Sequence, residues 1–153
     1  MKTLIVYYSR TNVTKEIANK LQKELDCDIE EITDGGKYDG KLGFLKGGMN
    51  ATMGRASDID PVSKNPADYD LIIIGTPVWS SNMAPPIFTY LIEYRDQIKN
   101  MASFCTCMGG GYDKALEKIA DVSGKEQIST MFLTSKDIEN PSEKINNFIN
   151  KIQ

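Results

Sequence analysis

Residues 4–14 read Leu-Ile-Val-Tyr-Tyr-Ser-Arg-Thr-Asn-Val-Thr, and this stretch decides the fold of the chain. Its first five residues form an apolar run typical of a buried strand, and an amphipathic helix pattern begins near Val13. A strand that passes through a short hydroxyl-rich turn into a helix brings several backbone N–H groups and the positive end of the helix dipole to one point. The stretch is therefore suited to a phosphate site. On its own it fits equally well an ordinary turn in which Thr11 or Asn12 only caps the helix.

Two further stretches point to the same edge of a sheet. Residues 76–82, Thr-Pro-Val-Trp-Ser-Ser-Asn, follow the apolar run 70–75, and Met-Gly-Gly-Gly-Tyr at 108–112 follows the apolar run 102–107. The carboxyl ends of parallel strands lie along one edge of their sheet, so the loops that follow them come together. The sequence thus predicts one site built from three loops.

The composition is that of an ordinary globular domain and excludes several classes of function. The chain has 153 residues, 41% hydrophobic and 25% charged, which predicts a single domain over residues 1–153. A net charge of −3 argues against a nucleic-acid partner, and no apolar run reaches the length of about 18 residues that a membrane span needs. Three cysteines, an odd number without a signal-peptide pattern, predict a cytoplasmic location. The lack of histidine excludes imidazole catalysis and histidine metal sites.

Apolar periodicity predicts five strands that alternate with helices. The strands are expected at residues 3–8, 28–32, 70–75, 102–107 and 127–134. The helices are expected at residues 13–25, from Pro85 onward, between Tyr112 and Gly124, and from an Asn140 cap with Pro141 in the first position. Residues 76–82 are expected to be a loop, and residues 33–68 a crossover with a short helix near 41–53.

This alternation indicates an α/β fold of three layers, α/β/α, with a five-stranded parallel sheet and right-handed crossovers. Strands 3–8 and 70–75 are the most apolar, and strands 28–32 and 127–134 are the most polar. The order 2-1-3-4-5 places the polar strands at the edges. In that order the winding direction reverses between the first and third strands, and a crevice opens beyond their carboxyl ends.

Residue types at the strand ends exclude three sites that use such a sheet. A response-regulator receiver needs acidic residues where this chain has Tyr8-Ser9 and Gly75-Thr76. No cysteine is followed six positions later by the arginine of a low-molecular-weight tyrosine phosphatase, and no Walker P-loop string occurs. What remains is a phosphate cradle without a catalytic lysine, next to a loop that carries the chain's single tryptophan, Trp79.

On these residues the chain resembles the flavodoxin family from Met1 to its last residue. The matching strings are Val6 to Thr14 with Ile17-Ala18, Ile74 to Trp79, and Phe104 to Cys107 with Gly109 to Gly111. The resemblance implies a flavodoxin-like fold with FMN bound in the crevice. The residues that it implies as FMN contacts are Ser9, Arg10, Thr11, Asn12, Val13, Thr14, Thr76, Pro77, Val78, Trp79, Ser80, Cys107, Met108, Gly109, Gly110, Gly111 and Tyr112.

The resemblance also implies a role for each loop. Ser9 and residues 11–14 would hold the phosphate, residues 76–80 would line one side of the isoalloxazine with Trp79 stacked on it, and residues 107–112 would contact its pyrimidine edge. Asn12 stands where the family commonly has glycine, but asparagine tolerates left-handed backbone angles better than most residues, so phosphate binding is expected to survive. Trp79 could instead belong to the core, and Tyr112 could be the first residue of a helix. Arg10 could pair with the phosphate or face solvent.

Two functions fit these features. The first is a low-potential FMN protein that shuttles single electrons between redox partner proteins, as a monomer or weak dimer without a substrate of its own. The alternative is an FMN-containing, NAD(P)H-dependent quinone or flavin reductase. The short chain favours the carrier, whereas a net charge of −3 is mild for docking by electrostatic steering. A scaffold that has lost FMN is a third hypothesis.

Cys105 and Cys107 are expected to be small core residues rather than a redox pair.

Overall fold

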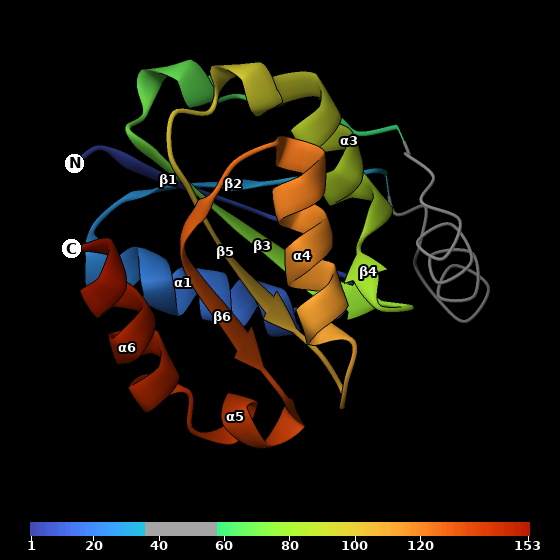
Figure 1. The fold of residues 1–153 in the computed structure, drawn as a ribbon, viewed down its shortest axis with the longest axis vertical. Coiled ribbons are helices and arrows are strands. Elements are labelled where there is room, and N and C mark those ends of the chain that lie inside the picture. The colour runs from blue at the N-terminus through green and yellow to red at the C-terminus, as the bar shows by residue number, and fades with distance from the viewer. Residues whose placement is uncertain (36–57) are drawn as a thin grey trace.

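The computed structural model describes residues 1–35 and 58–153. The short helix expected near 41–53 lies outside the described residues, as does most of the expected crossover. The elements in chain order, labelled in Figure 1, are β1 (Thr3–Tyr7), α1 (Val13–Leu25), β2 (Asp28–Glu31), η1 (Pro66–Asp68), β3 (Leu71–Trp79), β4 (Asn82–Met83), α3 (Pro85–Tyr94), η2 (Arg95–Gln97), β5 (Met101–Thr106), α4 (Tyr112–Ser123), β6 (Gln127–Leu133), α5 (Ser135–Glu139) and α6 (Ser142–Ile152).

The main strands form a parallel sheet in the order β2-β1-β3-β5-β6. This is the expected order 2-1-3-4-5 once the short strand β4, which pairs only with β3, is set aside. The fold prediction is therefore confirmed. The switch in winding direction lies between β1 and β3, whose central pairs include Val6 with Ile74.

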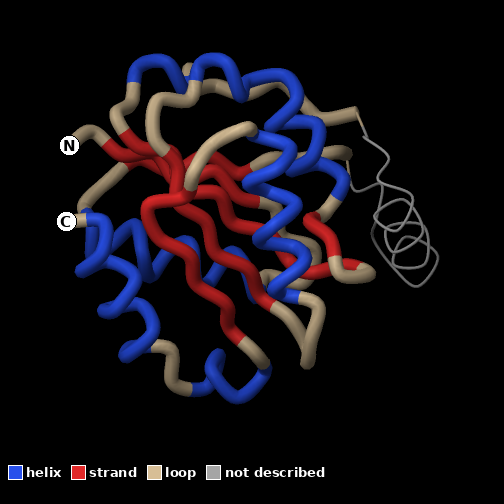
Figure 2. The backbone as a smooth tube through the Cα atoms, in the orientation of Figure 1, coloured by secondary structure: helices blue, strands red, loops and turns tan. Residues whose placement is uncertain are grey.

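Helices cover both faces of the sheet, as Figures 1 and 2 show. On one face α1 and α6 bury Ile17, Leu21 and Phe148 against the sheet. On the other face α3 and α4 bury Ile87 and Ile119. Strand β1 is buried along its whole length because it is covered on both sides, which explains its continuous apolar sequence. Within residues 1–35 and 58–153, none of the helices has the length and apolar character that crossing a membrane requires.

The expected loop over residues 76–82 is wrong. Strand β3 continues to Trp79 and turns through Ser80 and Ser81 into β4, so that Trp79 pairs with Asn82. The backbone N–H of Ala84 donates to the buried hydroxyl of Thr76 over 2.9 Å and fixes the returning strand. Ser-Ser is not one of the dipeptides that signal a two-residue hairpin, so the local sequence does not predict this turn.

The C-terminal part also differs from the expectation. A short helix, α5, was not predicted. It begins after Thr134, whose N–H and hydroxyl both donate to the Asp137 carboxylate. Asn140 ends this helix instead of capping the next one, and Pro141 is the N-cap of α6. The Asn-Pro pair therefore separates two helices, which its pattern alone does not distinguish from one helix start.

Tyr90 on α3 is the buried polar side chain whose hydrogen bonding is incomplete. Its ring is fully buried in the core under α3, and within the described part of the chain its hydroxyl has no hydrogen-bond partner. An unsatisfied buried hydroxyl costs about 1–3 kcal/mol. Burial raises the pKa of this phenol, so it stays neutral in the folded chain.

We expect Tyr90→Phe to raise the free energy of unfolding by about 1 kcal/mol, because it removes the unsatisfied hydroxyl and keeps the ring. Urea denaturation followed by circular dichroism would measure the change. Tyr69→Phe is the matched control: the Tyr69 hydroxyl donates to Asp28 over 2.7 Å, so its loss should lower the unfolding free energy. Equal effects of the two substitutions would contradict the prediction.

Candidate functional site

The first loop joins the end of β1 to the start of α1. Asn12, the N-cap residue, has a φ of 69°, in the left-handed region. Asparagine here takes a left-handed backbone conformation, the kind of angle that it tolerates better than most residues. The hydroxyl of Ser9 accepts a hydrogen bond from the N–H of Lys15 over 3.3 Å, and the Glu16 N–H donates to the Asn12 carbonyl. These two hydrogen bonds fix the turn at the start of the helix.

The donors left at this helix start fit an anion. Among the described residues, the N–H groups of Val13 and Thr14 donate to no other residue, and they lie at the positive end of the α1 dipole. Thr11 and Asn12 are exposed, and Arg10 is half-buried beside them. Two unused N–H groups on a 13-residue helix, next to hydroxyl and guanidinium side chains, match the charge and acceptor oxygens of a phosphate.

The second loop is the β3–β4 hairpin. Thr76 is buried, and Pro77 and Val78 are half-buried. The Trp79 ring is 8% exposed and belongs to the core on the α3 side of the sheet. It meets the Tyr8 ring edge to face, with centroids 5.7 Å apart. The structure thus places Trp79 at the carboxyl end of β3, beside the first loop, with most of its surface covered by protein.

The third loop follows β5. Cys107 is buried, whereas the Met108 side chain is 92% exposed and the Cβ positions of Gly109 and Gly110 face open space. Gly111 has a φ of 85° and caps α4. Tyr112 is the first residue of that helix, and its ring stacks on Phe132 with centroids 3.8 Å apart and planes 6° apart. One face of Tyr112 is therefore already occupied.

Two contacts join the third loop to the other two. The hydroxyls of Thr14 and Thr106 lie 2.9 Å apart in a buried hydrogen bond between the start of α1 and the end of β5. A Cβ on Gly111 would lie 2.8 Å from the Ser81 hydroxyl oxygen, so glycine is needed for the hairpin to approach this loop. The structure thus brings the three predicted loops together. Sequence reasoning missed Thr106, since nothing local in a strand marks a partner on a distant helix.

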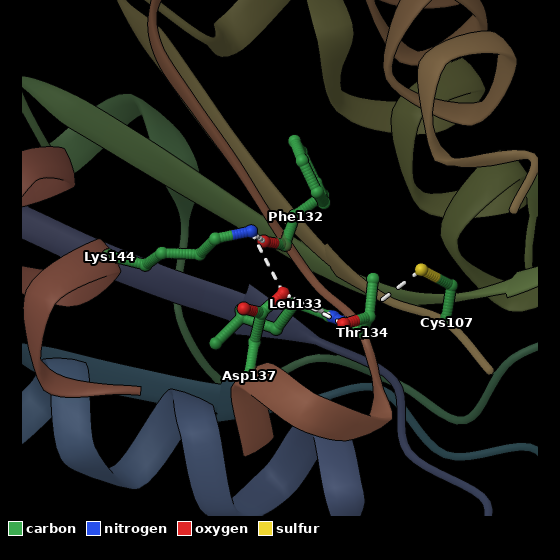
Figure 3. Close-up of polar contacts among 6 residues, drawn as sticks. All are labelled: Cys107, Phe132, Leu133, Thr134, Asp137 and Lys144. Carbon is green, nitrogen blue, oxygen red and sulfur yellow. Dashed lines mark hydrogen bonds and ion pairs between the residues drawn. The ribbon is translucent and has the colours of Figure 1, made fainter. Parts of the chain in front are cut away.

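A charged network lies at the carboxyl end of β6, next to Cys107, as Figure 3 shows. Lys144 from α6 donates to the Phe132 carbonyl over 3.0 Å and to Asp137 over 2.8 Å. The Lys144 hydrogen bond, together with the N–H of Thr134, lowers the pKa of the Asp137 carboxyl. The same lysine lies 3.6 Å from the centre of the Phe132 ring, beneath the Tyr112 stack. This network orders the segment after β6, and from that segment the Ser135 hydroxyl donates to the Met108 carbonyl of the third loop over 3.4 Å.

The two cysteines near the third loop are buried thiols. Both Cys105 and Cys107 are free, and the Cys107 thiol donates to the Leu133 carbonyl over 3.7 Å. Burial raises the pKa of the Cys107 thiol, although an N–H from Gly109 partly offsets this effect. Burial also raises the pKa of Cys105. Neutral thiols of this kind pack as small apolar groups. In the part of the chain that is described, no three His, Cys, Asp or Glu side chains gather as a metal site.

Comparison with known proteins gives consistent results. A family model described as flavodoxin matches residues 2–152. The flavoprotein in complex with FMN from Lactobacillus acidophilus NCFM is 28% identical, with a TM-score of 0.76 over 92% of this chain and 98% of that one. Oxidised flavodoxin 1 from Bacillus cereus, 18% identical with a TM-score of 0.57, matches over 98% of both chains and shares the fold. A search of curated protein sequences finds no significant match.

We expect Ser81→Gly to raise the free energy of unfolding by about 0.5 kcal/mol. Ser80 and Ser81 have φ values of 50° and 59°, and such angles cost a residue other than glycine roughly 1–2 kcal/mol, part of which the greater unfolded-state entropy of glycine offsets. Ser135→Gly, at the start of α5 with negative φ, is the control and should lower stability. Thermal and urea denaturation of both variants would test the prediction, and destabilisation by Ser81→Gly would contradict it.

Asp137→Asn should lower the free energy of unfolding by roughly 0.5–1 kcal/mol at neutral pH, a low value because the carboxylate is partly exposed. The folded-state pKa of Asp137 is depressed, so its contribution is present above about pH 3.9, where a free aspartate titrates, and disappears as pH falls through the folded-state value. Denaturation of both proteins between neutral and acidic pH should show the difference closing on the acid side. Glu139→Gln, on the same helix, should leave the curve unchanged. A difference that is constant with pH would contradict this account.

Proposed function

The chain belongs to the flavodoxin family, and we propose that it is an FMN-binding, low-potential electron carrier that passes single electrons between redox partner proteins. The chain is a flavodoxin-like flavoprotein with FMN as its cofactor, and the similar flavoprotein from Lactobacillus acidophilus is in complex with FMN. The geometry of the three loops supports the carrier role.

The first loop suits the FMN phosphate. The N–H groups of Val13 and Thr14 and the side chains of Ser9, Arg10 and Thr11 supply donors at one helix start. Asn12 takes the left-handed backbone angle that keeps these N–H groups at the end of the helix. A phosphate there would gain hydrogen bonds from the Val13 and Thr14 N–H groups, which make none within the described chain.

The other two loops suit the isoalloxazine ring. Residues 76–80 would line one side with Trp79, and residues 107–112 would provide backbone groups for the polar edge. Gly109 and Gly110 allow close approach of the backbone because they carry no side chain. Trp79 and Cys107 are 8% and 9% exposed, so each offers the ring a small apolar edge. Tyr112 has one ring face on Phe132, so only its other face could take part.

The observation that carries the electron-carrier proposal is the openness of the third loop. Met108 is 92% exposed, and open space surrounds the two glycines that follow it. When bound, FMN accepts and releases electrons singly or in pairs. A carrier needs its ring edge within reach of another protein, and an exposed methionine beside it offers an adaptable apolar contact.

The pairing of nearby lysines supports the low potential. Lys15, in the first turn of α1, lies 3.1 Å from Glu31, and Lys144, beside the third loop, lies 2.8 Å from Asp137. Unpaired positive charge near the ring would favour the reduced, anionic form of the cofactor and raise the potential. Here both ammonium groups are already compensated by carboxylates.

Anaerobic reduction of the FMN-loaded protein tests the proposal. We expect dithionite to bleach the flavin spectrum, and NADH or NADPH to leave it unchanged over the time of catalytic turnover, because a carrier receives electrons from a protein. Free FMN at the same concentration is the control. Rapid bleaching by either nicotinamide nucleotide, with turnover after a quinone is added, would establish a reductase and overturn the carrier role.

A further inference from the structure

The hydroxyls of Thr14 and Thr106 form the buried hydrogen bond that links the first and third loops. Their oxygens lie 2.9 Å apart, although the residues are 92 positions apart in the chain. Thr14 is 2% exposed and Thr106 is 5% exposed. Within residues 1–35 and 58–153, neither hydroxyl has a hydrogen bond to any other group. Each therefore depends on the other for its partner.

The hydroxyl and the backbone N–H of Thr14 face different surroundings. Its side chain points into the protein toward β5, whereas its backbone N–H lies at the start of α1 among the groups that suit a phosphate. Since the residue is 2% exposed, the bond between its hydroxyl and Thr106 lies within the protein. The N–H remains for the anion.

Thr106 is the last residue of β5, immediately before the third loop. Thr14 is the second residue of α1, immediately after the first loop. The bond between them therefore fixes the separation of the helix start, which suits a phosphate, from the loop that suits the ring. No backbone hydrogen bond between α1 and β5 is recorded in the described chain to do the same.

We propose that Thr106 is a positioning residue that couples the phosphate half of the FMN site to its ring half. The inference rests on the FMN binding of the proposed function and assigns a role to a residue that does not itself contact the cofactor. A ligand that spans both halves gains affinity when their separation is fixed in advance, because the protein does not have to be ordered on binding. A ligand that occupies one half gains nothing from the link.

Three ligands separate these cases. FMN spans both halves, riboflavin carries the ring without the phosphate, and inorganic phosphate carries only the anion. For Thr106→Val we expect FMN affinity to fall by about 3- to 10-fold, the range for one lost hydrogen bond, with riboflavin and phosphate affinities unchanged. Flavin fluorescence titrations measure the first two, and the amide shifts of Val13 and Thr14 in NMR measure the third.

Two further variants separate positioning from folding stability. Thr106→Ser keeps the hydroxyl and should restore FMN affinity to the wild-type value. Thr14→Val/Thr106→Val removes both hydroxyls, so no buried donor is left unpaired and stability should recover toward wild type. FMN affinity in this double variant should nevertheless stay as low as in Thr106→Val, because the link is still absent.

The outcomes are distinct. A loss of phosphate affinity equal to the loss of FMN affinity would make the Thr14 hydroxyl an anion ligand and overturn the coupling role. An equal loss for riboflavin, or recovery of FMN affinity together with stability in the double variant, would also overturn it and leave a structural role. Wild-type protein that binds no FMN would refute the proposed function itself. Equal FMN affinities of the wild-type protein and the Thr106→Val variant would refute only this inference.

Discussion

The unsatisfied N–H groups at the start of α1 are the constraint on which the site depends. Every helix leaves such groups, and most helices cover them with a side-chain cap. Here the N-cap residue, Asn12, makes no side-chain cap, because its left-handed backbone carries the chain directly from the strand into the helix. The donors stay available, and the fold must hold them in place by other means.

The parallel sheet holds the start of α1 in place. Strand β1 is covered on both faces, so its end cannot shift without disturbing two cores. Its neighbour β3, and β5 on the far side of β3, end at the same edge, and this brings the hairpin and the glycine loop beside the helix start. The site is thus a consequence of topology: three segments that share no local sequence feature meet because their strands are adjacent.

The sequence predicted the parts of this structure that depend on local pattern. The bounds of α1 follow from apolar periodicity, and the strand order follows from the polarity of the strands. The β3–β4 hairpin was missed because Ser80 and Ser81 carry no turn signal and adopt angles that serine rarely takes. Helix α5 was missed because it is short and depends on the Thr134–Asp137 contact. Pairing between Thr14 and Thr106 exists only once the sheet has formed.

The hairpin and the third loop approach each other closely at Gly111 and Ser81. Gly111 lets the third loop approach Ser81, and the serine hairpin accepts unfavourable angles to meet it. These contacts, with the Thr14–Thr106 bond, hold the three loops together, whereas Met108 and the two glycines beside it remain exposed. The fold therefore keeps most of the contacts between the loops inside, while the Met108 side chain and the two glycines that follow it face outward.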